Sequence, residues 1–124
     1  MATTKKQIKQ LDSGRVYTTA TYNNTLITIT DKQGNAVLAG STGSAGFKGS
    51  RKSTPYAATK AIDQVVQRAK ALGLREVDVF IKGPGHGRDA VLRVLKGSGI
   101  RVRLIADVTP LPHNGCRPRK RRRA

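Results

Sequence analysis

Hydrophobic and polar residues alternate along three short stretches in the first third of the chain. Residues 15–22 and 25–30 alternate in this way and are rich in threonine, and the Asn-Asn pair between them is a turn signal. Residues 36–39 follow a second turn, which contains Asp31 and Gly34. Alternation with a period of two is typical of strands that bury one face. The pattern therefore predicts an antiparallel meander of three strands.

A helical period replaces this alternation after residue 53. Ser53 or Thr54 can cap the N-terminus of a helix, Pro55 suits its first position, and Gly73 ends it. Apolar residues recur at every third or fourth position and form one stripe. The stripe consists of Ala58, Ala61, Ile62, Val65, Ala69 and Leu72.

Strand and helix patterns then follow one another up to residue 108. Residues 76–81 predict a strand with its three aliphatic residues turned inward, and residues 89–96 predict a short helix that Asp89 caps and two glycines end. Residues 100–108 predict a last strand. In that strand we expect Leu104 and the other even-numbered apolar residues on one face and Ile105 on the opposite face.

The order of these elements determines the fold class. From residue 36 onward, strand, helix, strand, helix and strand follow one another, which requires right-handed crossovers and parallel pairing. We predict an α/β fold: a mixed sheet of about five strands, in which parallel strands extend the antiparallel meander, with two helices packed on it. This arrangement resembles the ribonuclease H topology. We expect a flexible basic arm at residues 1–14, a core domain at 15–108 and an extended basic tail at 109–124.

The charge of the chain indicates a polyanionic partner. Its 124 residues include 24 lysines and arginines but only 7 acidic residues, so the formal net charge is +17. A solvated basic surface usually carries acids among its bases, whereas this chain has few, which favours a nucleic-acid partner. The single cysteine, Cys116, has no partner for an internal disulfide. Because no apolar run of 18 residues and no signal peptide is visible, we expect a cytoplasmic protein, with an organellar location left open.

Three acid-poor segments carry the candidate binding residues. The first is the glycine-rich loop of residues 40–54, which leads into the long helix. A helix N-terminus that follows such a loop is typical of a phosphate-binding site. The second is the turn of residues 83–88, and the third is the tail, where Pro110 and Pro112 prevent regular structure. We predict binding residues at Lys48, Arg51, Lys52, Ser53, Arg88, His113, Asn114, Arg117, Arg119, Lys120, Arg121, Arg122 and Arg123.

The kind of nucleic acid follows from what the sequence lacks. No zinc-finger spacing or heptad repeat is present, and only 4% of the residues are aromatic, which argues against stacking of bases on a sheet of aromatic side chains. Contact through several separate loops and tails suits folded RNA. The cations would neutralise phosphates, and His113 and Asn114 would contact specific RNA edges. A protein that binds duplex DNA is the alternative.

Catalysis is not predicted, although a nuclease has to be weighed because of the fold. Two-metal chemistry needs clustered carboxylates, and only Asp78 and Asp107 could meet across neighbouring strands. His86, His113 and Cys116 lack the fourth ligand of a zinc site. We therefore expect no catalytic residue, no metal and no cofactor, with a nuclease that uses the two aspartates as the rival hypothesis.

Four segments resemble one known family: YNNTLITITDKQGNA, GFKGSRKSTPYAA, IKGPGHGRDA and DVTPLPHNGCRPRKRR. Together they are similar to small-subunit ribosomal protein eleven of the bacterial type, and the similarity runs from about residue 16 to 123. The resemblance implies RNA-facing segments at 46–54, 83–88 and 113–123. Arg119 stands where the family usually has a second proline, and His86 where it more often has an apolar residue or proline.

The resemblance also implies a biological role. A member of this family is a structural protein that binds small-subunit rRNA on the platform, bridges separate rRNA helices and forms part of the cleft that holds the Shine-Dalgarno helix. Its implied neighbours are ribosomal proteins seven and eighteen, with messenger RNA and initiation factor three nearby. It implies neither a membrane nor a small-molecule substrate.

Overall fold

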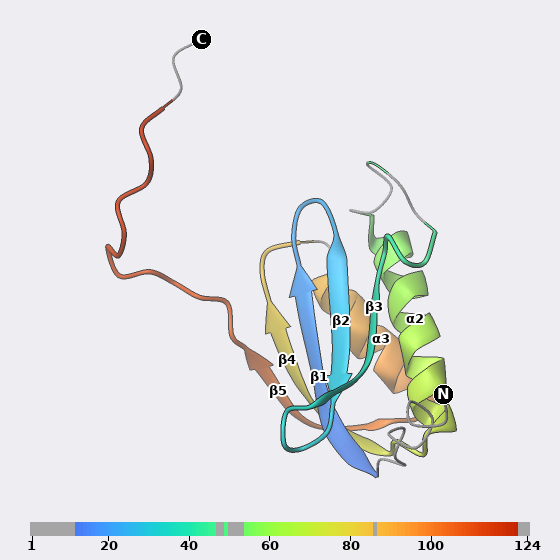
Figure 1. The fold of residues 1–124 in the computed structure, drawn as a ribbon. Coiled ribbons are helices and arrows are strands. Elements are labelled where there is room, and N and C mark those ends of the chain that lie inside the picture. The colour runs from blue at the N-terminus through green and yellow to red at the C-terminus, as the bar shows by residue number, and fades with distance from the viewer. Residues whose placement is uncertain (1–11, 47–48, 50–53, 86, 122–124) are drawn as a thin grey trace, which may run out of the picture.

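The computed structural model describes residues 12–46, 49, 54–85 and 87–121 of the chain (Figure 1). The strands form one sheet in the order β3-β2-β1-β4-β5. The elements follow one another as β1 (Ser13–Ala20), β2 (Thr25–Thr30), β3 (Ala36–Ser41), α2 (Pro55–Ala71), β4 (Glu76–Lys82), α3 (Arg88–Ser98) and β5 (Arg101–Asp107).

The pairing of the strands divides the sheet into an antiparallel and a parallel part. β1 pairs antiparallel with β2, and β2 pairs antiparallel with β3. On its other side β1 pairs parallel with β4, which in turn pairs parallel with β5. The predicted α/β fold, a meander extended by parallel strands with two helices, is therefore confirmed.

The start of α2 is the feature that the sequence predicts best. The side-chain oxygen of Thr54 accepts a hydrogen bond from the backbone N–H of Ala57 at 3.1 Å, and Pro55 occupies the first helical position. The cap satisfies one of the donors that a helix leaves open at its N-terminus. The buried stripe also includes Ala57 and Val66, whereas Leu72, which was predicted to belong to it, lies at the C-cap and is only half-buried.

The start of α3 differs from the prediction. The helix begins at Arg88 behind Gly87, and no side chain caps it, so the expected cap at Asp89 is wrong. Asp89 lies in the first turn instead, where its negative charge is favourable beside the helix dipole. At the other end, Gly99 adopts a left-handed conformation with φ 84° and terminates the helix.

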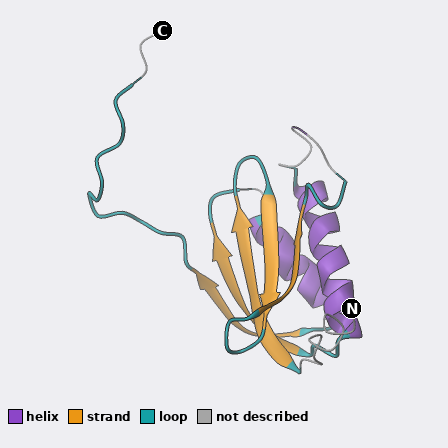
Figure 2. Cartoon of the chain, in the orientation of Figure 1, coloured by secondary structure: helices purple, strands orange, loops and turns teal. Residues whose placement is uncertain are grey.

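Both helices cover the same face of the sheet, and the described chain places no element on the other face (Figure 2). The core lies between these two layers. Its largest fully buried side chains come from β1, β2, β4, α2 and α3, and they include Val16, Ile27, Ile29, Ile62, Val66, Val77, Val79, Val91 and Leu95. The inward side of β4 is thus the one predicted.

The faces of β5 are not those that simple alternation predicts. Val102 pairs with Val77 and Ile105 pairs with Val79, so both side chains lie on the helix face. The register shifts between these pairs, which inserts one extra residue, and Leu104 consequently lies on the open face opposite Asp78. A β-bulge therefore reverses the expected face of every residue that follows it in the strand.

The first strand ends two residues earlier than predicted. The backbone N–H of Thr21 donates to the carbonyl oxygen of Asn24 at 2.8 Å, and this bond closes a turn that removes Thr21 and Tyr22 from the strand. β3 continues to Ser41, two residues further than expected. Among the described residues, no helix is long and apolar enough to cross a membrane.

Candidate nucleic-acid interface

Several loops gather at one end of the sheet, which we call the loop edge. It consists of the turn 21–24, residues 42–46 after β3, the described part of the turn 83–87, and the start of the tail at residue 108. The parallel strands β1, β4 and β5 all end there, and α2 and α3 both begin there (Figure 1). Ligands of open α/β sheets bind outside the carboxyl ends of the strands.

Backbone contacts bind the turn 83–87 to the end of β1. The N–H of Gly85 donates to the carbonyl oxygen of Ala20 at 2.8 Å. A Cβ atom on Gly85 would overlap the carbonyl oxygen of Thr21, and a Cβ atom on Gly87 would overlap the side chain of Thr25. Glycine is required at position 85 because the two turns approach so closely there, and Gly87 packs closely against the first residue of β2.

The segment after β3 is joined to the loop edge by Asn24. The side-chain oxygen of Asn24 accepts a hydrogen bond from the hydroxyl of Thr42, which is completely buried. It also accepts from the backbone N–H of Thr25 at 2.7 Å. The start of the glycine-rich loop is thus fixed to the turn 21–24.

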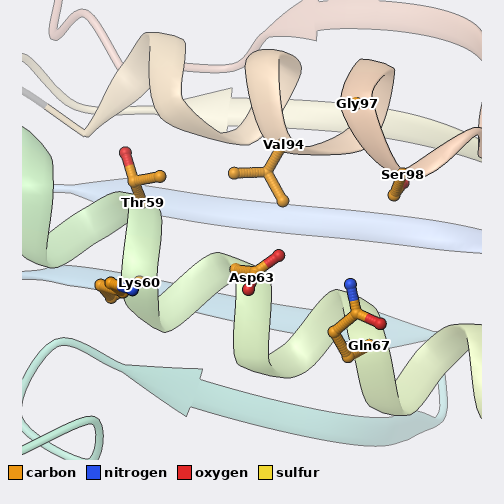
Figure 3. Close-up of a pocket in the computed structure, with 7 residues that line it drawn as sticks. All are labelled: Thr59, Lys60, Asp63, Gln67, Val94, Gly97 and Ser98. Atoms are coloured by element: carbon orange, nitrogen blue, oxygen red, sulfur yellow. The ribbon is translucent and has the colours of Figure 1, made fainter.

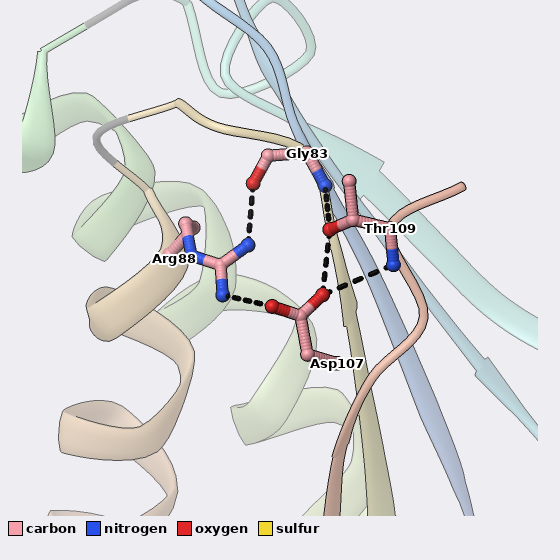
Figure 4. Close-up of polar contacts among 4 residues, drawn as sticks. All are labelled: Gly83, Arg88, Asp107 and Thr109. Carbon is pink, nitrogen blue, oxygen red and sulfur yellow. Dashed lines mark hydrogen bonds and ion pairs between the residues drawn. The ribbon is translucent and has the colours of Figure 1, made fainter. Parts of the chain in front are cut away.

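Arg88 connects the turn to the beginning of the tail (Figure 4). One terminal nitrogen of its guanidinium donates to the carbonyl oxygen of Gly83 at 2.5 Å, and the other lies 2.7 Å from a carboxylate oxygen of Asp107. The second oxygen of Asp107 accepts from the hydroxyl of Thr109 at 2.6 Å and from its N–H at 3.0 Å. The hydroxyl of Thr109 in turn accepts from the N–H of Gly83 at 3.1 Å. We call these four residues the tail anchor.

The tail anchor stabilises the ionised form of Asp107. The hydroxyl and the backbone N–H of Thr109, and then the guanidinium of Arg88, lower the pKa of the Asp107 carboxyl from 3.8 to about 2. Both partners remain partly accessible, with 33% of the Arg88 side chain and 54% of the Asp107 side chain exposed. At neutral pH the anchor therefore holds one positive and one negative charge, which compensate each other.

The acidic residues of the chain are distributed away from the loop edge. Asp12 and Glu76 lie at the opposite end of the sheet, as does Asp31, whose side chain bonds the turn 31–35. Only Asp89 and Asp107 lie at the loop edge, and Asp107 is paired with Arg88. The cations of the tail thus leave the sheet from an edge with little negative charge to compete for them.

The tail runs away from the body of the protein as an extended chain (Figure 1). His113, Asn114 and the cations from Arg117 to Arg121 are all exposed, and Asn114 has a positive φ of 56°. Asparagine tolerates this left-handed conformation better than most residues. The predicted binding residues Lys48, Arg51, Lys52, Ser53, Arg122 and Arg123 lie outside the described residues.

The carboxylates of the rival nuclease do not come together. Asp78 pairs with Leu104 and Asp107 pairs with Ile81, so the two aspartates are offset by three positions along neighbouring strands and lie on opposite faces. That offset is about 10 Å, too far for two carboxylates that must share a pair of metal ions. No group of three or more potential metal ligands occurs among the residues that the structure describes.

A groove between α2 and α3 offers no catalytic arrangement either (Figure 3). Figure 3 shows Thr59, Asp63 and Gln67 on the side of α2 that faces α3, and Asp63 is the one carboxylate among the lining residues. The groove is lined by Thr59, Lys60, Asp63, Gln67, Val94, Gly97 and Ser98.

One part of the loop edge is missing from the predicted site. The turn 21–24 was expected only to connect two strands, yet it lies between the segment after β3 and the turn 83–87. The topology predicts this position, because a strand that pairs parallel with β1 must end at the same edge of the sheet as β1. Any turn after β1 therefore joins the turn after β4.

The α/β scaffold, the cationic tail and the separated carboxylates define a basic binding protein rather than a two-metal nuclease. A family model described as ribosomal protein S11 matches residues 14–123. Two proteins named small ribosomal subunit protein uS11, from two strains of Treponema pallidum of which one is the Nichols strain, are each 56% identical to the chain over 125 residues. The alignment covers 99% of this chain and 99% of each relative.

The chain therefore belongs to the ribosomal protein S11 family. The family is a structural, non-enzymatic component of the ribosome. The protein is accordingly a constituent of the small ribosomal subunit, a ribonucleoprotein that acts in translation.

Proposed function

We propose that the protein binds small-subunit rRNA on the platform through its loop edge and tail. In this proposal it bridges several rRNA helices and contributes to the cleft that holds the Shine-Dalgarno helix. Its neighbours are ribosomal proteins seven and eighteen, messenger RNA and initiation factor three lie nearby, and the ribosome concerned is cytoplasmic.

The observation that carries the proposal is the convergence of the loops at one edge. Both helices direct their N-termini there, and the N-terminus of a helix bears a partial positive charge. Cationic side chains extend from the same edge along the tail. Because the loops and the tail point in different directions from a rigid sheet, they suit separate rRNA helices rather than one straight duplex.

The binding residues divide by role. The exposed cations of the tail neutralise phosphates, and His113 and Asn114 contact RNA edges. Arg88 has a different part, because both of its terminal nitrogens are already bonded within the tail anchor. We assign to Arg88 the positioning of the tail, and its prediction as a phosphate contact stays untested.

The single cysteine offers a direct test of this placement. Cys116 is exposed in the tail between Asn114 and Arg117, so a thiol-linked iron chelate placed there generates hydroxyl radicals beside the proposed contacts. In purified small subunits we expect rRNA cleavage in at least two separate platform helices and near the strand that pairs with the Shine-Dalgarno sequence.

A control variant carries the chelate at the opposite end of the protein. Cys116→Ser combined with Lys70→Cys places the thiol in the last turn of α2, on an exposed residue far from the loop edge. Its cleavage pattern should differ from that of Cys116. Cleavage from Cys116 that is confined to one helix, or that lies away from the Shine-Dalgarno pairing strand, would overturn the bridging model.

A further inference from the structure

Tyr22 is the most exposed aromatic side chain that the structure describes. It occupies the turn 21–24, at the centre of the loop edge, and 69% of its surface is accessible. Within the described part of the chain its ring stacks on no other ring, and its hydroxyl makes no hydrogen bond. An aromatic residue of this size ordinarily buries most of its surface. Its exposure leaves the ring free to contact a partner outside the chain.

The turn that carries Tyr22 is held from both sides. The hydroxyl of Thr21 accepts from the backbone N–H of Asn24 at 3.0 Å and from that of Asn23 at 3.4 Å. The side chain of Asn24 is bonded to Thr42 and to the first residue of β2. The backbone of Tyr22 is thus fixed before any partner binds, which lowers the entropic cost of binding.

The turn that carries Tyr22 is polar and contains no acidic residue. The other three turn residues carry hydroxyl or amide side chains, and the side chain of Asn23 is exposed and forms no hydrogen bond to a described residue. The neighbouring turn 83–87 presents glycines, and the negative charge of Asp107 is compensated by Arg88. A protein partner would favour further apolar side chains beside the ring in the core of the contact, whereas these polar groups suit a nucleobase and its sugar-phosphate backbone.

We propose that Tyr22 stacks on an unpaired base of small-subunit rRNA, with Asn23 beside it to bond the edge of the base. The turn 21–24 is then a fourth RNA-binding segment, in addition to the three acid-poor segments. Unpaired bases in loops and bulges are the sites at which RNA-binding proteins use aromatic side chains. The inference rests on the proposed function, because it requires that the loop edge face rRNA.

Photocrosslinking in purified small subunits tests the contact directly. Ultraviolet irradiation joins a tyrosine to a base on which it stacks, and mass spectrometry identifies the modified peptide and nucleotide. We expect an rRNA adduct on Tyr22, and none at this peptide in subunits that carry Tyr22→Leu. The leucine variant retains an apolar side chain but cannot stack.

A competition measures the contribution of the ring. Equal amounts of the full-length parent and of one variant are supplied during reconstitution of small subunits, and their ratio in the product is read by mass spectrometry. We expect Tyr22→Leu to compete about 5- to 150-fold less well than the parent, since one stacked base contributes that factor. Tyr22→Phe keeps the ring and should compete nearly as well as the parent. Unchanged thermal unfolding of both variants shows that the fold is intact.

The outcomes separate the inference from the function on which it rests. Adducts on the tail without any on Tyr22, or equal incorporation of Tyr22→Leu, would leave rRNA binding standing and overturn the stacking role. An adduct that joins Tyr22 to a neighbouring protein would do the same and assign the turn to a protein contact. If neither the tail nor Tyr22 gave an rRNA adduct, the proposed function itself would fail.

Discussion

The tail should determine how strongly rRNA binding depends on salt. Residues 117–123 include six cations, and the four that the structure describes are exposed and form no ion pair with a described residue. Each cation that neutralises a phosphate releases counterions, which lowers the slope of log K against log salt by about 0.7 to 0.9. The double variant Arg117→Gln/Arg119→Gln should therefore reduce the magnitude of the slope by about 1.4 to 1.8.

The chain offers a matched control for this change. Arg68 and Lys70 are also exposed and lie in the last turn of α2, at the end of the sheet opposite the loop edge. The double variant Arg68→Gln/Lys70→Gln removes the same net charge from the protein. If the loop edge faces the RNA, this variant should leave the slope close to that of the parent, because charges beyond a Debye length are largely screened.

The assay is a series of binding isotherms for small-subunit rRNA at increasing salt concentrations. Circular dichroism should show that neither double variant changes the fold, since all four residues are exposed and none belongs to the core. Equal reductions of the slope in both variants would mean that the RNA responds to net charge alone. An unchanged slope in the tail variant would refute the assignment of the tail to phosphate contacts.

Four further predictions concern the stability of the folded chain. Asp107→Asn removes the negative charge that Arg88 meets in the tail anchor. Because the pKa of Asp107 is lowered to about 2, the stabilisation that its charge contributes is complete above pH 3.8 and is lost as the pH falls toward 2. The melting temperatures of parent and variant should therefore converge at low pH. Gly85→Ala should destabilise the protein by about 1 to 3 kcal/mol, because the new Cβ meets the backbone of the turn 21–24. Gly97→Ala lies in α3 with open space around the new Cβ atom, and it should instead stabilise the protein by about 0.5 to 1 kcal/mol. Urea titrations in which both variants are less stable than the parent would contradict the steric argument. Thr18→Val should raise stability by about 1 to 3 kcal/mol, because the buried hydroxyl has no partner among the described residues; a less stable variant would show that the hydroxyl is satisfied.

Local signals predicted the elements that depend on local chemistry. The cap at Thr54, the proline at position 55 and the stripe of apolar residues specify α2 without reference to the rest of the chain. The strand Thr25–Thr30 is likewise bounded as its alternation predicts. The parallel pairing of the later strands followed from the order of elements alone.

The errors arose where distant residues decide the outcome. The bulge in β5 depends on how Val77 and Asp78 of the neighbouring strand align with it, and no periodicity within residues 100–108 records that register. Asp89 precedes an apolar pattern and so predicts a cap, whereas the helix begins at Arg88 behind Gly87, whose backbone lies too close to the side chain of Thr25 to carry a Cβ atom. In both cases tertiary packing overrides a local preference.

Arg88 shows the same limit for the candidate site. As one cation in an acid-poor segment it resembled the others, but Asp107 lies 19 residues later in the sequence and meets it through the parallel pairing of β4 and β5. Because the two residues lie far apart in the sequence, no local pattern predicts that they pair. A count of cations therefore overestimates the charge that a site presents to RNA.

The glycines of the turn 83–87 have a structural reason that changes how the loop edge recognises RNA. Glycines without side chains can bring bare amides close to an RNA backbone, yet the amide of Gly83 bonds Thr109 and the amide of Gly85 bonds Ala20. Because these donors are occupied within the chain, the glycines serve to let the end of β1 and the start of the tail pack closely against the turn. Recognition then falls to the groups that the packing leaves exposed: the tail cations and, by our inference, Tyr22. A rigid edge with a few projecting side chains fixes the directions in which the protein can hold separate RNA helices, which is what a bridging protein requires.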